Sequence, residues 1–284
     1  MPSSFQRHRS RAAVLTAVIL LSLSVTDHGR TQDKPKIDGG PQAIKSFGRR
    51  IVGGEPTTIK EHPWQVALNV VLDGEIFVCG GSLVADRWVL TAAHCFRPST
   101  KPNEVKVKSG ATDLVAEGQW SSIERIVIHE ANDPRTHEND LALIRLSFPA
   151  EGRIIPMMKI AQPLTVGQPL EVAGWGATSY GGYAARRLLK ATVPYVANDK
   201  CNEPAAYIGA VKPSMMCAGY QEGGVDSCQG DSGGPLVWYT GDGPVLVGVV
   251  SWGDGCARKL RYGIYTRVAM YADWIAKVVA GNGS

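Results

Sequence analysis

From residue 63 onward, the chain contains many short apolar runs separated by turn-forming residues. The runs are rich in Val, Leu, Ile and Ala, and several alternate apolar with polar positions. They cover residues 63–72, 77–84, 88–91, 105–108, 123–129, 141–146, 170–173, 188–196, 235–239, 245–252 and 263–268. Short strands with Gly, Pro and Asp between them predict an all-β barrel or sandwich.

Two regions depart from this pattern. At the C-terminus, Met270, Trp274 and Val278 recur at every fourth position, with Ile275 and Val279 beside them. This spacing predicts a helix whose apolar face packs against the protein. The Pro-rich segment 149–169 predicts a linker that divides the strands into two halves.

Residues 1–50 lack the strand pattern. Three arginines precede an apolar run over residues 12–25, which is shorter than the roughly 20 residues that span a bilayer. We therefore expect residues 1–25 to be a signal peptide and the protein to be secreted, extracellular or periplasmic, without a membrane anchor. Residues 26–50 are polar and end in Arg49-Arg50. Such a segment cannot bury enough apolar surface to fold alone, which is typical of a linker or pro-segment.

Composition and charge narrow the class of protein. The chain is 44% hydrophobic and 20% charged, which excludes a collagen, a simple coiled coil and a disordered tail protein. The formal charge is +4, but nine of the 30 Lys/Arg and only three of the 26 Asp/Glu lie in residues 1–50. The remaining 21 basic and 23 acidic residues give residues 51–284 a charge of −2. We therefore expect no nucleic-acid partner.

All six cysteines lie beyond residue 78, and none forms a C-x-x-C pair. Zinc-ligand spacing is therefore absent. An even number of cysteines behind a signal peptide predicts three disulfides formed in an oxidising compartment. The spacing by itself leaves their pairing open.

Three short segments carry the chemistry. A serine hydroxyl is a poor nucleophile unless a base takes its proton, and a third group must orient that base. The glycines around the serine permit a tight turn that can aim backbone N–H groups at one point. The order His, Asp, Ser differs from the orders in subtilisin and in α/β-hydrolases. The segments are Leu90-Thr91-Ala92-Ala93-His94-Cys95, Asn139-Asp140-Leu141-Ala142-Leu143-Ile144 and Asp226-Ser227-Cys228-Gln229-Gly230-Asp231-Ser232-Gly233-Gly234-Pro235.

Together with three further segments, these motifs resemble the trypsin-like members of the chymotrypsin family of serine peptidases. The resemblance covers residues 51–284. It implies two antiparallel six-stranded β-barrels with a C-terminal α-helix, the first barrel over about 51–155 and the second over about 156–284, with the site in the cleft between them. The further segments are Ile51-Val52-Gly53-Gly54, Gly174-Trp175-Gly176 and Ser251-Trp252-Gly253.

The resemblance assigns roles to the central residues. His94 is implied as general base and then acid, Asp140 as the group that orients it, and Ser232 as the nucleophile. The backbone N–H groups of Gly230 and Ser232 are implied as the oxyanion hole. The implied disulfides are Cys79–Cys95, Cys201–Cys217 and Cys228–Cys256.

Specificity and activation are implied in the same way. Asp226 matches the acid at the base of the primary pocket, which predicts cleavage after Arg or Lys because a buried carboxylate demands a cationic partner. Cleavage between Arg50 and Ile51 would free an α-amino group that pairs with Asp231. Since the segment ends in arginine, self-activation is compatible with this specificity. Gly253, Gly263, Ser251 and Trp252 match the substrate-binding walls, and His137 lies near the next subsite.

Two other functions remain as alternatives. An inactive homologue used as a binding module would lack one of the three central residues, and all three are present. An esterase or lipase would show a G-x-S-x-G elbow, and Gly230 to Gly234 fit that pattern. However, such an enzyme would be an α/β chain in which the serine precedes the histidine, whereas here the histidine comes first. We expect no cofactor and no metal, a monomer, and protein or peptide substrates as partners, with protein protease inhibitors as further partners.

Overall fold

The computed structural model describes residues 52–159 and 163–281. The expected signal peptide and pro-segment, with Arg50 and Ile51, lie outside the described residues. Every apolar run predicted to be a strand forms one. The structure adds two strands and a short helix that the pattern did not indicate.

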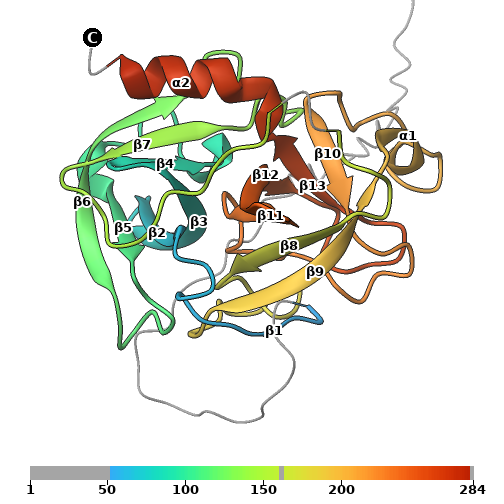
Figure 1. The fold of residues 1–284 in the computed structure, drawn as a ribbon, viewed down its shortest axis with the longest axis horizontal. Helices are drawn as coiled ribbons and strands as arrows, with labels where there is room; N and C mark the ends of the chain where they lie inside the picture. The colour runs from blue at the N-terminus through green and yellow to red at the C-terminus, as the bar shows by residue number, and fades with distance from the viewer. Residues whose placement is uncertain (1–51, 160–162, 282–284) are drawn as a thin grey trace, which may run out of the picture. The chain divides into compact units, whose positions relative to one another are not determined.

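The first half forms a closed antiparallel barrel (Figure 1). Its strands follow the order β2-β3-β4-β7-β6-β5, and pairing of β2 with β5 closes it. The Asp73-Gly74 turn joins β2 to β3 with positive φ at both residues, the geometry that tight hairpins require. The strands are β2 (Gln65–Leu72), β3 (Glu75–Ala85), β4 (Trp88–Thr91), β5 (Val105–Ser109), β6 (Gln119–Ile128) and β7 (Ala142–Leu146).

The second half forms another closed antiparallel barrel. Its six strands follow the order β9-β10-β13-β12-β11-β8, and a further pairing of β8 with β9 closes the ring. The short strand β1 (Glu55–Pro56) adds to β9 outside this ring. The two barrels confirm the predicted fold class. The strands are β8 (Pro169–Gly174), β9 (Leu189–Val196), β10 (Met215–Ala218), β11 (Pro235–Thr240), β12 (Gly243–Trp252) and β13 (Gly263–Arg267).

Strand β10 escapes sequence patterning because it is four residues long and consists of Met-Met-Cys-Ala. None of these residue types strongly favours a strand. Its place is set by its neighbours, since it pairs with β13 along its whole length and with the end of β9.

The C-terminal helix α2 (Ala272–Ala280) follows a 3₁₀ turn, η3 (Val268–Tyr271). Ile275 is fully buried, and Trp274 and Val278 pack on the same core cluster as the first barrel. Met270 does not belong to this face, because it is 48% exposed. The 3₁₀ turn has about three residues per turn rather than 3.6, which shifts Met270 out of the helical register.

The other helical turns are short. They are η1 (Ala93–Cys95), η2 (Pro102–Glu104) and α1 (Asn198–Cys201). Within the described residues, no helix is both long enough and apolar enough to cross a membrane.

The first barrel offers a direct test of core packing. Ile144 in β7 is fully buried, whereas Phe148, four residues later, is 76% exposed. We expect Ile144→Ala to lower the free energy of unfolding by about 2–5 kcal/mol, and Phe148→Ala to change it by less than about 0.5 kcal/mol. Urea unfolding in a Ser232→Ala background, which prevents self-digestion, measures both. Equal losses in the two variants would contradict the assigned register.

Candidate active site

His94 and Asp140 meet because two strands of the first barrel lie side by side. Strand β4 pairs with β7 so that Thr91 lies opposite Ala142. His94 follows β4 in the turn η1, and Asp140 lies just before β7. The Asp140 Oδ2 atom lies 2.7 Å from His94 Nδ1, and Oδ1 accepts the backbone N–H of His94 at 2.9 Å.

The second barrel completes the surroundings of Asp140. The Ser251 hydroxyl in β12 donates to Asp140 Oδ2 at 2.5 Å, and the Thr266 hydroxyl in β13 donates to the Asp140 carbonyl at 2.8 Å. Burial by itself would raise the pKa of the fully buried Asp140. The charge and hydrogen bonds of His94, with the Ser251 hydroxyl, outweigh burial and lower this pKa to about 2. Asp140 therefore stays ionised and holds the Nδ1–H of His94.

The Ser232 loop is fastened to the same part of the first barrel. The Ser232 carbonyl accepts the N–H of Gly80 at 2.7 Å. The N–H of the next residue, Gly233, donates to the Val250 carbonyl of β12 at 2.8 Å. Gly80 follows Cys79, and His94 precedes Cys95, which is disulfide-bonded to Cys79. The bridge thus links the segment that holds Ser232 to the segment that carries His94.

Gly233 has a structural reason to be glycine. Its φ is +81°, and a Cβ at this position would press on Thr91 Oγ1 and the Gly80 carbonyl. These two groups are themselves hydrogen-bonded at 2.7 Å. A side chain at residue 233 would therefore push the Ser232 loop away from the first barrel.

Two N–H groups beside Ser232 remain available. Among the described residues, neither the Gly230 N–H nor the Ser232 N–H donates to an acceptor, whereas Asp231 between them donates to the Cys228 carbonyl at 3.0 Å. Gly230 adopts a φ of +95° in this turn. A pair of unused N–H groups next to a serine can bind a developing oxyanion.

Asp226 is a buried carboxylate that no lysine or arginine of the described residues neutralises. It is 4% exposed, and its Oδ2 atom accepts the Ala257 N–H at 3.1 Å. Burial raises the pKa of Asp226 to about 7, although hydrogen bonds from Ala257 and Ser227 oppose this rise. A cation that reached this carboxylate would gain a partner that is already desolvated.

The space near Asp226 depends on a glycine in β13. A Cβ on Gly263 would lie 2.7 Å from Asp226 Oδ1 and 2.9 Å from the Tyr265 hydroxyl. The residue at 263 must therefore be small for the carboxylate to be reached. At Gly253 a Cβ would meet nothing nearer than 3.5 Å, so that wall is open. The Cys228–Cys256 disulfide joins the two segments that border Asp226.

Asp231 is fully buried and also lacks a cationic partner among the described residues. Its two carboxylate oxygens accept the N–H groups of Gly176 at 2.8 Å and Cys228 at 3.0 Å. Burial raises its pKa to about 6, against the effect of these hydrogen bonds. The nearby residue Val52 lies close to the same loop, because its carbonyl accepts the Asp226 N–H at 3.2 Å.

Aromatic rings line up beside His94. Its ring lies edge-on to His137 at 6.0 Å between centroids, and His137 stacks on Trp252 at 6.1 Å. Tyr207 lies edge-on to Trp252 at 5.1 Å between centroids. Burial lowers the pKa of His137, which keeps its ring neutral near pH 7.

The structure adds functional candidates that the motifs did not identify. Tyr207, Thr266 and Tyr265 reach the site from a loop and from β13. Tyr265 and Thr266 lie in an apolar strand pattern that indicates only a barrel wall. Ser251 was predicted as a substrate-binding residue, and its hydroxyl is also a partner of Asp140. The remaining disulfide joins Cys201 to Cys217, so all three bonded pairs are those that the resemblance implies.

The loop of residues 110–118 contains two acids, Asp113 and Glu117, and therefore tests whether a calcium ion fits. The buried Lys108 ammonium donates to the Leu114 carbonyl at 2.6 Å. Glu117 accepts the N–H groups of Thr112 and Asp113, and Arg186 pairs with the Asp113 carboxylate. The oxygens that calcium requires are already engaged, and a cation occupies the loop. This loop does not fit calcium.

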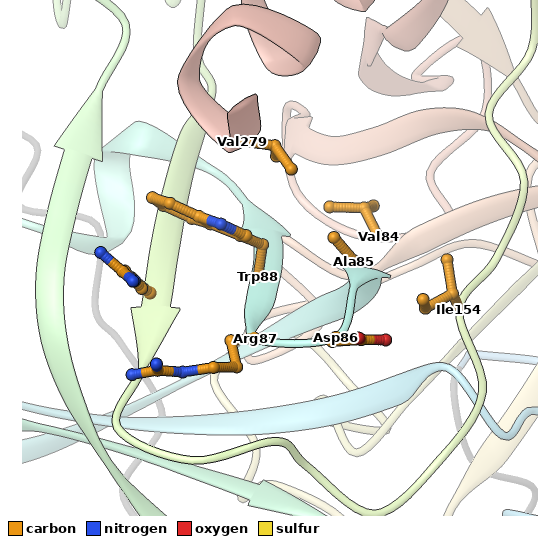
Figure 2. A pocket seen from close by; sticks show the side chains of 8 residues that line it. Val84, Ala85, Asp86, Arg87, Trp88, Ile154 and Val279 are labelled. Carbon is orange, nitrogen blue, oxygen red and sulfur yellow. The ribbon is translucent and has the colours of Figure 1, made fainter. Parts of the chain in front are cut away.

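A separate cavity of about 410 Å³ shares no residue with this site (Figure 2). It lies at the turn between β3 and β4, beside the end of α2. Its lining consists of Val84, Ala85, Asp86, Arg87, Trp88, Arg145, Ile154 and Val279.

Two comparisons with known proteins bear on this site. The family model described as Trypsin matches residues 51–275. A Mus musculus protein named Transmembrane protease serine 11C is 38% identical over 242 residues, which cover 83% of this chain and 55% of that protein. The chain thus spans about half the length of this curated relative.

The raised pKa of Asp226 predicts a pH-dependent stability. An unfolded aspartate has a pKa of about 3.9, whereas the folded value is about 7. Between these values the folded chain binds more protons than the unfolded chain, so the Asp226 contribution to stability falls as pH rises. We therefore expect the free energy of unfolding of Asp226→Asn, relative to that of the parent, to increase as pH rises. The increase should be up to about 1.4 kcal/mol per pH unit between about pH 4 and 7.

Urea unfolding of Ser232→Ala and Ser232→Ala/Asp226→Asn at several pH values measures this difference. The matched control is Asp242→Asn, an exposed acid in the turn after β11, for which the difference should stay flat. A constant difference between the Asp226 pair over this range would contradict the prediction.

Proposed function

The chain belongs to the trypsin family, and from this premise we propose that it is a serine-type endopeptidase that cleaves proteins after Arg or Lys. The catalytic residues are proposed to be Ser232, His94 and Asp140. The observation that supports them best is the buried, ionised Asp140, bonded at 2.7 Å to His94 beside the Ser232 loop.

The proposed reaction proceeds in two halves. His94 takes the proton of the Ser232 hydroxyl while the serine oxygen attacks the substrate carbonyl. The negative oxygen that forms is held by the N–H groups of Gly230 and Ser232. His94 then gives its proton to the leaving amine, which departs and leaves an acyl-enzyme. A water molecule, deprotonated by His94, hydrolyses the ester and restores Ser232.

Asp140 contributes by remaining an anion throughout the cycle. Its low pKa, about 2, keeps it ionised when His94 becomes an imidazolium. The buried carboxylate then stabilises that positive charge and fixes the ring so that its other nitrogen faces the serine. The Ser251 hydroxyl from the second barrel keeps the carboxylate itself from turning, and the Thr266 hydroxyl holds the backbone carbonyl of the same residue.

Asp226 is proposed to select the substrate. A buried carboxylate with a pKa of about 7 and no cationic partner among the described residues favours a ligand that brings its own positive charge. Gly263 and Gly253 leave room for the long side chain of Arg or Lys. Trp252 and Ser251 are proposed to contact the substrate residues before that side chain.

Activation is proposed to follow cleavage between Arg50 and Ile51. The new α-amino group would pair with Asp231, whose buried carboxylate otherwise lacks a cation among the described residues. The position of Val52 against Asp226 supports this proposal, because it brings the adjacent chain to the loop that contains both acids. Pairing would lower the energy of an ionised Asp231 and so fix the loop around Gly230.

We propose that the protein is a secreted monomer with protein substrates and protein inhibitors as partners. The support is the sequence of residues 1–25, which lie outside the described residues. The curated relative carries the word transmembrane in its name, so membrane attachment is the alternative. Separation of cells from culture medium after expression of the full chain decides between them.

The activation step predicts a difference between precursor and cleaved chain. We expect little hydrolysis of an Arg-amide chromogenic substrate before cleavage at Arg50 and full turnover afterwards. Arg50→Gln should stay inactive, and Arg49→Gln is the matched control that should still activate. Ser232→Ala, cleaved by an added protease, should remain inactive. Turnover by the Ser232→Ala variant would overturn the proposed mechanism.

The specificity proposal predicts a loss confined to basic substrates. Asp226→Ser should lower kcat/KM for Arg and Lys substrates by roughly 10²- to 10³-fold, since removing one partner of a buried charge pair costs about 3–5 kcal/mol. Asp242→Ser removes an exposed acid and should leave these rates unchanged. Profiling both variants on a peptide library gives the measurement. Undiminished cleavage after Arg and Lys in Asp226→Ser would show that another residue sets specificity.

A further inference from the structure

Three side chains beside the proposed nucleophile form a cluster of metal-ligating groups. His94, His137 and Asp140 each offer one ligand atom, and these atoms lie within 4.8 Å of one another; no other such cluster occurs among the described residues. Two of these residues have proposed or expected roles in catalysis, but neither role explains the position of His137. We propose that this cluster binds Zn²⁺ and that the bound ion inhibits the enzyme reversibly.

The donor set matches zinc rather than a harder cation. Two imidazole nitrogens and one carboxylate oxygen are ligands that Zn²⁺ takes at about 2.0–2.2 Å. Calcium and magnesium prefer oxygen ligands, and they would find only one side chain of that kind here. Three protein ligands also leave a fourth position open for water, as in catalytic zinc sites.

One ring nitrogen of His137 makes no hydrogen bond within the described part of the chain. This atom, Nδ1, is buried. A buried polar atom without a partner is unfavourable, and an ion bound by that atom would supply one. The ring is confined on two sides, by His94 and by Trp252, so it remains near the cluster.

The backbone around His137 is fixed by polar side chains. Asn132 donates to the carbonyls of Glu138 and Asn139, and Asn139 donates to the Ala131 carbonyl at 2.7 Å. The Tyr271 hydroxyl donates to Asn139 Oδ1 at 2.9 Å. These bonds support positive φ values at His137 and Asn139, which ordinary residues rarely adopt.

Coordination requires a small movement of side chains. Tetrahedral zinc places neighbouring ligand atoms roughly 3.3–3.5 Å apart. The His94 Nδ1 to Asp140 Oδ2 distance of 2.7 Å would lengthen, while the wider separations in the cluster, which all lie within 4.8 Å, would shorten. The hydrogen bond from Ser251 keeps the carboxylate oriented, as outer partners do in zinc sites.

Inhibition follows from the ligands that are used. An ion bound to His94 and Asp140 separates the proposed base from the group that orients it. It also adds positive charge where an imidazolium must form during the reaction, which opposes proton uptake by His94. Removal of the ion by a chelator restores the original pair. This inhibition rests on the proposed catalytic role of His94, whereas zinc binding does not.

Zinc binding is measured first, on the Ser232→Ala chain cleaved at Arg50. Titration calorimetry with ZnCl₂ should show one site, and His137→Gln should weaken it by at least about tenfold. The matched control is His129→Gln, which removes a neighbouring histidine that packs on Tyr271 and Trp274 outside the cluster. It should leave the affinity unchanged. Equal affinity in the His137 variant and the parent would overturn the proposed site.

Inhibition is measured next, on cleaved enzyme with an Arg-amide substrate. Each variant is compared with its own zinc-free rate. Zinc should inhibit the parent and His129→Gln, excess EDTA should restore activity, and His137→Gln should need at least about tenfold more zinc. Equal potency of Ca²⁺ or Mg²⁺ would overturn the assignment to zinc.

The two measurements separate this inference from the proposed function. If turnover without zinc is normal and His137→Gln binds zinc as tightly as the parent, the metal site is overturned and the proposed function stands. Zinc binding that depends on His137, in a chain whose zinc-free turnover equals that of Ser232→Ala, overturns the proposed catalytic role and leaves the metal site standing.

Discussion

The buried carboxylate of Asp140 is the interaction on which the candidate site depends. It lies at a junction that neither barrel completes alone. His94 reaches the carboxylate from the first barrel and Ser251 reaches it from the second, while Thr266 of the second barrel bonds the Asp140 backbone carbonyl. An unpaired ionised carboxylate at this depth would cost several kcal/mol. Its low pKa shows that the partners outweigh this cost. Loss of any partner therefore disturbs both the docking of the barrels and the position of His94.

The other two buried acids of the site show the opposite balance. Asp226 and Asp231 accept backbone N–H groups but have no cationic side chain among the described residues, and burial raises both pKa values. The folded chain therefore contains two carboxylates that favour a cation from elsewhere. A substrate side chain for Asp226 and a new α-amino group for Asp231 would each supply one. The same physical constraint, the cost of a buried charge, would then underlie both the proposed specificity and the proposed activation.

The zinc proposal extends this reasoning to the neighbouring ring. His137 is held close to Asp140 and His94 by a loop with two strained positions, and its buried nitrogen has no protein partner in the described chain. A site that assembles a neutral base next to a carboxylate also assembles metal ligands, because general bases and zinc ligands are the same groups in the same protonation state. Here a third donor, His137, lies within reach of the same pair.

The sequence by itself determined the family, the fold class and the strands that alternate or run apolar, because hydrophobic periodicity and the His94, Asp140 and Ser232 motifs are local signals. It did not predict β10, whose position is set by pairing with β13. It also placed Met270 on the apolar face of the helix, whereas Met270 lies in a 3₁₀ turn. Only the tertiary structure decided that Thr266, Tyr265 and Tyr207 reach the site. It also decided that the ligand atoms of His137 and Asp140 lie close enough to bind one metal ion. These relations join residues from separate strands and loops. No local pattern records them, because burial, pKa and proximity arise only when the barrels close and pack together.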